Sequence, residues 1–357
     1  MDIKELLQEV VASKASDLHL RVPSPPVLRV DGELIPLSKY PGCSTDDIRQ
    51  AFEEITNEVQ RERFYRELEL DLAYSVPGLA RFRVNVSQQR GTLSLAFRHV
   101  SYTIPTMEEL GLPRLCKQLS LKRKGLIIIT GPTGSGKSTT LAAMIGYLNK
   151  NDSRNVICIE DPIEFLHRND KCIISQRELG DDTRAFATAL KHCLRQDPDV
   201  ILVGEMRDLD TIATALTAAE TGHLVLTTLH TNTTSQTVDR IIDVFPQGQQ
   251  EQVRMQLSVV IEAVLAQALL PKTDGSGRVA AFEVMIGTDS IRNLIRENKA
   301  YQIPTYIQVS SKDSMQTMEQ ALHKLIITGT ITRESGLSHA NNPEELLILL
   351  GDGKKRK

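Results

Sequence analysis

A glycine-rich segment constrains this chain more than any other feature of its sequence. Residues 131–138 read Gly-Pro-Thr-Gly-Ser-Gly-Lys-Ser and fit the pattern G-x-x-x-x-G-K-[ST] in full. The segment follows the apolar stretch Leu126–Thr130 and precedes a helical pattern over Thr139–Leu148. Because a strand, a glycine loop and a helix in this order form the usual phosphate-binding loop, the setting favours that loop over a chance glycine turn.

Each residue type in this segment suits the binding of a nucleoside triphosphate and Mg²⁺. Glycines let the backbone approach phosphate oxygens closely, and the start of the following helix adds partial positive charge. Lys137 is expected to reach the β- and γ-phosphates, and the hydroxyl of Ser138 to bind the metal ion. The expected contacts are Gly131, Pro132, Thr133, Gly134, Ser135, Gly136, Lys137, Ser138 and Thr139.

Acidic residues follow two other apolar stretches, and hydrolysis needs a group that polarises water. Glu205 comes after Val200–Val203, and an acidic segment at 160–164 begins where Val156–Ile159 ends. Since ligands of α/β sheets collect at the carboxyl ends of the strands, both groups are expected near the γ-phosphate, with solvated loop acids as the alternative. The favoured acids are Glu205 and Glu164, followed by Glu160 and Asp161.

Two histidines, His223 and His230, flank the apolar stretch 224–229. A histidine at the end of a strand can contact the γ-phosphate or link it to a neighbouring subunit, but it can also be a hydrogen-bonded structural residue. The five cysteines contain no C-x-x-C pair, so we expect buried thiols and neither zinc nor disulfides.

Two hydrophobic patterns divide the chain into two domains, and together they predict an α/β protein. Residues 1–99 alternate apolar and polar side chains, which predicts an antiparallel sheet with helices over 3–11 and within 45–70. From 122 to 350, continuous apolar strands alternate with helices, which predicts a parallel sheet. Pro105, Gly111 and Pro113 mark residues 100–121 as a linker. Residues 351–357 are expected to form a basic tail. The expected strands are 17–22, 27–30, 81–86, 92–98, 126–130, 156–160, 200–204, 224–229, 263–270 and 278–286.

Composition excludes several classes of protein. The 357 residues are 41% hydrophobic and 24% charged, as in packed globular chains. Lys plus Arg (42) and Asp plus Glu (45) nearly balance at a net charge of −3, which disfavours binding mainly to nucleic acid. No apolar run approaches the ~20 residues of a membrane span, and the N-terminus has the pattern of an amphipathic helix rather than of a signal peptide. A cytoplasmic protein is expected.

Several segments together resemble the secretion ATPases. They are Ser16–Leu20 (SDLHL), the loop Gly131–Ser138, the acidic box Glu160–Glu164 (EDPIE), the stretch Leu194–Arg207 that ends in GEMR, and the histidine box Thr221–His230. Within this family the chain is most similar to the motors that retract type IV pili. Ser290–Ile295 (SIRNLI) resembles their C-terminal AIRNLI motif with Ser290 in place of Ala, and the four-cysteine zinc module of related extension and type II secretion ATPases is absent.

The resemblance implies a PAS-like N-terminal domain joined by the linker to a RecA-like ATPase core, with ATP and Mg²⁺ bound between them in a homo-hexamer. It assigns Glu205 and Glu164 to hydrolysis and makes His223 and His230 the histidine pair of the family. Arginines of the N-terminal domain act as sensors or fingers in such proteins. The candidates are Arg81, Arg83 and Arg98, with a solvated strand face as the alternative.

The resemblance also implies how the motor works. Closure of the two domains on ATP, with 100–121 as hinge, would displace an inner-membrane pilus platform protein, through which alone the motor contacts the membrane. The expected outcome is pilus retraction and twitching motility. The alternatives are an accessory retraction ATPase, a RecA-like ATPase that translocates nucleic acid, and a regulatory subunit that binds nucleotide but hydrolyses little.

Overall fold

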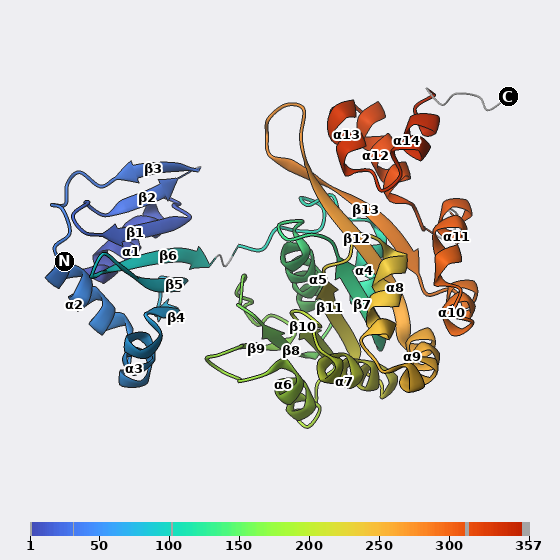
Figure 1. Ribbon diagram of the computed structural model, residues 1–357, viewed down its shortest axis with the longest axis horizontal. Helices are drawn as coiled ribbons and strands as arrows, with labels where there is room; N and C mark the ends of the chain where they lie inside the picture. Colours follow the sequence, from blue (N-terminus) through green and yellow to red (C-terminus); the bar gives the residue numbers. More distant parts are fainter. Residues whose placement is uncertain (1, 31, 101–102, 311–313, 352–357) are drawn as a thin grey trace. The chain divides into compact units, whose positions relative to one another are not determined.

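The computed structural model describes residues 2–30, 32–100, 103–310 and 314–351. They form two compact units (Figure 1). The first comprises residues up to Thr103 together with Glu164–Leu166, and the second comprises Ile104–Ile163 and the chain from His167 onward. Positions 101–102 of the expected linker and all but the first residue of the expected basic tail lie outside the described residues.

The first unit is a six-stranded antiparallel sheet in the order β3-β2-β1-β6-β5-β4, as the alternating pattern predicted. Its strands are β1 (Asp17–Arg21), β2 (Val27–Val30), β3 (Glu33–Pro36), β4 (Glu69–Val76), β5 (Ala80–Gln89) and β6 (Thr92–Val100), and its helices are α1 (Ile3–Ala12), α2 (Thr45–Ile55) and α3 (Glu58–Glu67). The sequence did not reveal β3, whose residues are all exposed, or β4, which directly follows the charged helix α3.

The two faces of this sheet differ in chemistry. Phe82 and Phe97 are fully buried in a core shared with the helices. Their neighbours in the strands point the other way. On that second face Arg83 lies opposite Arg98, and Arg98 lies opposite Asp17, to which its Nε donates a hydrogen bond of 2.9 Å. Two of the three arginine candidates therefore stand side by side on the face away from the core.

The second unit is a seven-stranded sheet in the order β13-β12-β7-β11-β10-β8-β9. Its strands are β7 (Gly125–Thr130), β8 (Asn155–Glu160), β9 (Ile173–Glu178), β10 (Val200–Val203), β11 (Leu224–Leu229), β12 (Ile261–Pro271) and β13 (Arg278–Ile286). All neighbours are parallel except β13, which runs antiparallel to β12. The exposed end and polar residues of β9 explain why the sequence did not predict it.

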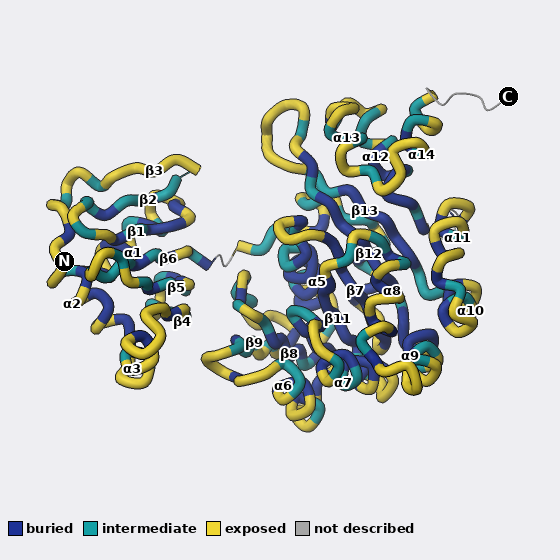
Figure 2. The backbone as a smooth tube through the Cα atoms, in the orientation of Figure 1, coloured by how far each residue is buried: buried dark blue, intermediate teal, exposed yellow. Residues whose placement is uncertain are grey.

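The central strands of this sheet are buried on both faces (Figure 2). Successive residues of β7 show this directly, because Leu126 and Ile128 pack into one core cluster while Ile127 and Ile129 pack into another. Continuous apolar strands of this kind require helices on both sides of the sheet. The helices are α4 (Leu115–Ser120), α5 (Lys137–Asn151), α6 (Phe186–Cys193), α7 (Leu209–Glu220), α8 (Thr234–Asp243) and α9 (Gln247–Val260).

Further short helices follow the last strand. They are α10 (Asp289–Arg296), the 3₁₀ turn η1 (Ala300–Gln302), α11 (Ile303–Val309), α12 (Met318–Ile327), α13 (Arg333–His339) and α14 (Pro343–Leu349). The last three pack against Ala268 and Leu270 of β12 and Ala281 of β13. Over the described residues, no helix has the length and apolar character that crossing a bilayer requires.

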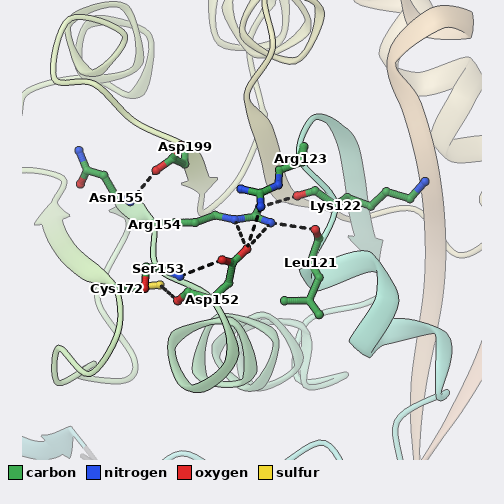
Figure 3. A network of polar contacts seen from close by, with 9 residues as sticks. All are labelled: Leu121, Lys122, Arg123, Asp152, Ser153, Arg154, Asn155, Cys172 and Asp199. Carbon is green, nitrogen blue, oxygen red and sulfur yellow. Dashed lines mark hydrogen bonds and ion pairs between the residues drawn. The ribbon is translucent and has the colours of Figure 1, made fainter.

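A buried arginine fixes the chain where it enters the sheet (Figure 3). Arg154, 5% exposed, donates from Nη1 to the Lys122 carbonyl at 2.5 Å and from Nη2 to the Leu121 carbonyl at 2.8 Å. Its Nε also donates to Asp152 at 2.9 Å. A buried guanidinium needs such partners to offset the cost of desolvation. The contacts tie the segment just before β7 to the start of β8.

Candidate nucleotide-binding site

The glycine loop leaves the carboxyl end of β7 and enters α5, in the arrangement that the sequence indicated. Gly131, Gly134 and Gly136 have φ of 141°, 79° and 89°, which side-chain-bearing residues rarely adopt. A Cβ on Gly131 would lie 2.3 Å from the carbonyl oxygen of Gln267 on β12. The backbone conformation therefore favours glycine at all three positions, and close packing also requires it at Gly131.

The loop offers donors and partial positive charge to an anion. Gly136 caps α5 without a side-chain hydrogen bond, so no side chain competes for the first amides of the helix. The hydroxyl of Ser135 is buried and has no hydrogen-bond partner among the described residues. Lys137 donates from Nζ to the carbonyls of Gly131 and Pro132 at 2.8 and 3.0 Å, within its own loop. An unpartnered buried hydroxyl and uncapped amides fit a phosphate group, whose oxygens accept hydrogen bonds.

The remaining expected contacts lie on this loop or at the start of the helix. Pro132, Thr133 and Gly134 are exposed, while Ser138 and Thr139 are half-buried in the first turn of α5. The hydroxyl of Ser138 is a hard oxygen ligand of the type that Mg²⁺ prefers. Its role as a metal ligand stays a prediction.

Glu205, His230 and Lys137 come together from neighbouring strands of the sheet. Each follows the carboxyl end of one strand, β10, β11 and β7 respectively. Nε2 of His230 lies 3.2 Å from Oε2 of Glu205, and Nδ1 lies 3.5 Å from Nζ of Lys137. Arg207 completes the group through an ion pair of 2.7 Å with the same Glu205 oxygen.

The pKa of Glu205 is lowered, which keeps the group an ionised base. Burial acts in the opposite direction and is the largest single influence, but the hydrogen bond from Arg207 and the charges of His230 and Arg207 together outweigh it. The pKa of Arg207 is raised by its hydrogen bond and ion pair with Glu205, and further by the charge of Asp161. An ionised carboxylate that follows the carboxyl end of β10 can accept a hydrogen bond from an attacking water.

The acidic box divides between two environments. Glu160 ends β8 and accepts a hydrogen bond of 3.0 Å from Nε2 of Gln176. The charge of Asp161 helps to raise the pKa of Arg207. Glu164 belongs to the segment Glu164–Leu166 that is grouped with the first unit. Its role, like those of Arg81, Arg83 and Arg98 in that unit, stays a prediction.

His223 lies at the amino ends of the parallel strands, whereas the loop lies at their carboxyl ends. Its carbonyl accepts from the amide of Gly125, the first residue of β7, at 3.0 Å. Its Nδ1 lies 2.9 Å from the carbonyl of Ala218 near the end of α7. Since six strand residues span about 20 Å, His223 lies far from the loop of its own chain, and its role stays a prediction.

Sequence reasoning gave no role to two residues that the structure brings to this site. Arg207 lies within the GEMR stretch that resembled the family, so the charge was visible although its partner was not. Gln267 falls within the expected strand 263–270, and the sequence signal for it is a polar residue among aliphatic ones.

No cluster of three or more His, Cys, Asp or Glu residues in the described parts of the chain has the arrangement of a metal site. The five cysteines are buried free thiols. Burial raises the pKa of Cys116 to about 12, which makes this thiol unreactive.

Comparison with known proteins places the chain in a family. The type II/IV secretion system protein family matches residues 96–337. The type IV pilus retraction ATPase PilT of Pseudomonas aeruginosa is 48% identical over 96% of this chain and 99% of the relative. The type IV pilus ATPase PilU of the same organism is 42% identical over 99% and 93%.

A solved structure shares the fold as well. The crystal structure of the pilus retraction motor PilT with bound ADP has a TM-score of 0.89 and 47% sequence identity, covering 97% of this chain and 99% of that chain. The mixed α/β architecture with two sheets is thus that of a known nucleotide-binding motor. On this evidence the chain belongs to the type II/IV secretion system protein family and is an ATPase.

Proposed function

We propose that this chain is the ATPase motor that powers retraction of type IV pili. The observation that carries the proposal is that Lys137, His230 and Glu205 lie together at the carboxyl ends of the central strands. The chain that holds them is 48% identical to PilT along nearly its whole length. An ATPase needs a phosphate cradle and a base that activates water, and these residues supply both.

The finer assignments are part of the same proposal. The second unit acts as a RecA-like core over 122–350, and the first as a PAS-like domain over 1–99, with 100–121 as the hinge. Lys137 and the loop amides hold the phosphates of ATP, and the hydroxyl of Ser138 holds Mg²⁺. The metal ion, when bound, neutralises charge on the phosphate oxygens.

Hydrolysis depends on two carboxylates. Glu205 accepts a proton from the attacking water, while His230 lies against both Glu205 and Lys137 and reports on the γ-phosphate. Glu164 is the second acid. Arg81, Arg83 and Arg98 contact nucleotide from the first unit, and His223 acts at the boundary with a neighbouring subunit.

The proposed assembly is a homo-hexamer that works on an inner-membrane pilus platform protein at the cytoplasmic face of the membrane. Its contact with the membrane is made through that partner, and nucleic acid is not a substrate. Closure of the two domains on ATP and their release after hydrolysis provide the stroke.

The test combines hydrolysis with motility. Wild-type protein is expected to hydrolyse ATP, while Lys137→Ala and Glu205→Ala lose at least about 100-fold in rate because each lacks a group used in the transition state. A strain that lacks the gene should keep its pili but lose twitching motility, and only the wild-type gene should restore it. Normal twitching in the deletion strain would reject the retraction assignment.

Two alternatives have their own readouts. An accessory retraction ATPase is supported by the 42% identity to PilU, and it predicts that retraction in the deletion strain is weakened but persists. A nucleic-acid translocase predicts ATP hydrolysis that single-stranded DNA stimulates. Equal rates with and without DNA are expected here.

A further inference from the structure

Gln267 supports the glycine loop from behind. The residue before it, Ala266, pairs with Thr130 at the end of β7, so Gln267 lies beside the first residue of the loop. The side chain is 3% exposed, and an amide so deeply buried is costly unless it is hydrogen-bonded.

Gln267 approaches the loop at both of its ends. Its carbonyl oxygen lies 2.3 Å from the position that a Cβ of Gly131 would take. Its side-chain Nε2 lies 3.0 Å from the corresponding position at Gly136, where α5 begins. One residue of a neighbouring strand therefore limits the path of the loop at its first and last glycines.

The amide oxygen of Gln267 also holds the first turn of the helix. Thr140, 1% exposed, donates from Oγ1 to Oε1 of Gln267 at 2.8 Å. The backbone amide of Thr140 donates to the carbonyl of Gly136 at 3.0 Å, so this residue closes the turn that carries Lys137 and Ser138. A buried side-chain hydrogen bond to that turn fixes the helix start relative to β12.

We propose that Gln267 is a positioning residue for nucleotide binding, which holds the glycine loop and the start of α5 in the geometry that receives the phosphates through its bond to Thr140. The inference rests on the proposed use of this loop for ATP. It predicts that the bond contributes to nucleotide affinity and not only to folding.

Paired variants test this in the full-length protein. Gln267→Leu and Thr140→Val each remove one partner at nearly constant volume, and each is expected to raise the Kd for ADP and the KM for Mg-ATP about five- to tenfold, the size of one buried hydrogen bond. The Kd for ADP of the double variant should be no higher than that of the single variant that binds ADP more weakly, because the same hydrogen bond is lost in all three variants. Thr140→Ser keeps the hydroxyl and should restore near-wild-type affinity.

The chain contains a matched control. Thr227 on β11 is buried, and its Oγ1 has no hydrogen-bond partner among the described residues. Thr227→Val makes the same chemical change as Thr140→Val and should leave the Kd for ADP and the KM unchanged.

The outcomes distinguish failure of the proposed role of Gln267 from failure of the proposed function. Lower melting temperatures with unchanged Kd and KM in Gln267→Leu and Thr140→Val would make Gln267 a purely structural residue and overturn the proposal. If Gln267→Leu does not fold, Thr140→Val alone decides by the same criterion. A wild-type protein that binds no ADP would overturn the proposed function itself.

Discussion

The imidazole of His230 lies with Nε2 3.2 Å from the carboxylate of Glu205. Its other nitrogen, Nδ1, is 3.5 Å from the Lys137 ammonium, so one ring touches both the expected base and the expected phosphate ligand. The two contacts come from opposite sides of a single small side chain. His230 therefore lies between the proposed base and the proposed phosphate ligand.

Glu205→Gln should abolish hydrolysis while leaving nucleotide binding intact. The amide keeps the shape of the side chain but is a poor base, so we expect kcat to fall at least about 100-fold. The Kd for ADP should change less than about threefold, because the proposed role of Glu205 is to activate water and not to hold the phosphates. Steady-state phosphate release and isothermal titration measure the two quantities, and Glu251→Gln on the exposed face of α9 is the control.

Arg207→Gln should move the acid limb of the pH–rate profile to higher pH. Burial raises the pKa of Glu205, and the hydrogen bond and charge of Arg207 help to hold it below its ordinary value. Without Arg207 the pKa of Glu205 rises, so the base becomes protonated at a higher pH than in the wild type. Profiles of kcat/KM against pH for the wild type, Arg207→Gln and Arg207→Lys check this, since lysine keeps the charge. Superimposable acid limbs would rule out the ion pair as the cause.

Gly131→Ala should weaken nucleotide binding. The new Cβ would lie 2.3 Å from the Gln267 carbonyl and 2.8 Å from Oγ of Ser135, at a φ of 141° that alanine rarely adopts. The loop must shift, and we expect the Kd for ADP to rise at least tenfold, in line with strain of about 1–3 kcal/mol. Gly248→Ala is the matched control, because its Cβ would meet no atom within 4 Å. Equal affinities for both variants would contradict the packing argument.

Arg154→Leu should destabilise the second unit by about 3 kcal/mol, because it leaves the carbonyls of Leu121 and Lys122 and the carboxylate of Asp152 without their shared donor. Chemical denaturation of the full chain measures the change. Arg123→Leu serves for comparison, since Arg123 is 79% exposed, lies 3.9 Å from the same carboxylate and should contribute less than about 0.5 kcal/mol. A similar loss in both variants would show that burial of Arg154 does not matter.

Glu283→Gln should flatten the dependence of stability on pH. Burial raises the pKa of Glu283, the charge of Glu319 raises it further, and hydrogen bonds from Thr234 only partly compensate. Because the folded state holds this proton more tightly than the unfolded state, the contribution of Glu283 to stability is greatest below its unfolded pKa. It is lost as pH rises through the folded pKa.

Melting temperatures between pH 4.5 and 7.5 check that sign. The wild type should lose more stability than Glu283→Gln as the pH increases across this range. The glutamine keeps an acceptor for Thr234, so the variant is expected to fold. A variant whose melting curve follows the wild type at every pH would assign the dependence to other groups.

The sequence by itself determined the glycine loop and most of the sheet. The pattern from Leu126 to Ser138 combines a buried strand, obligatory glycines and a helix start, and each of these depends on local chemistry. Apolar runs predicted β11 and β13 to the residue. By contrast β3 and β9 carry exposed residues, so no burial pattern marked them.

Only the tertiary structure decided which polar groups meet. His223 and His230 belong to one motif, yet the length of β11 places them at opposite ends of this strand. Gln267 is distant in sequence from Thr140, and the parallel pairing of β12 with β7 brings them within 2.8 Å. Periodicity reports which face of an element is buried, whereas strand order sets which ends lie together, and that order depends on packing across the whole sheet.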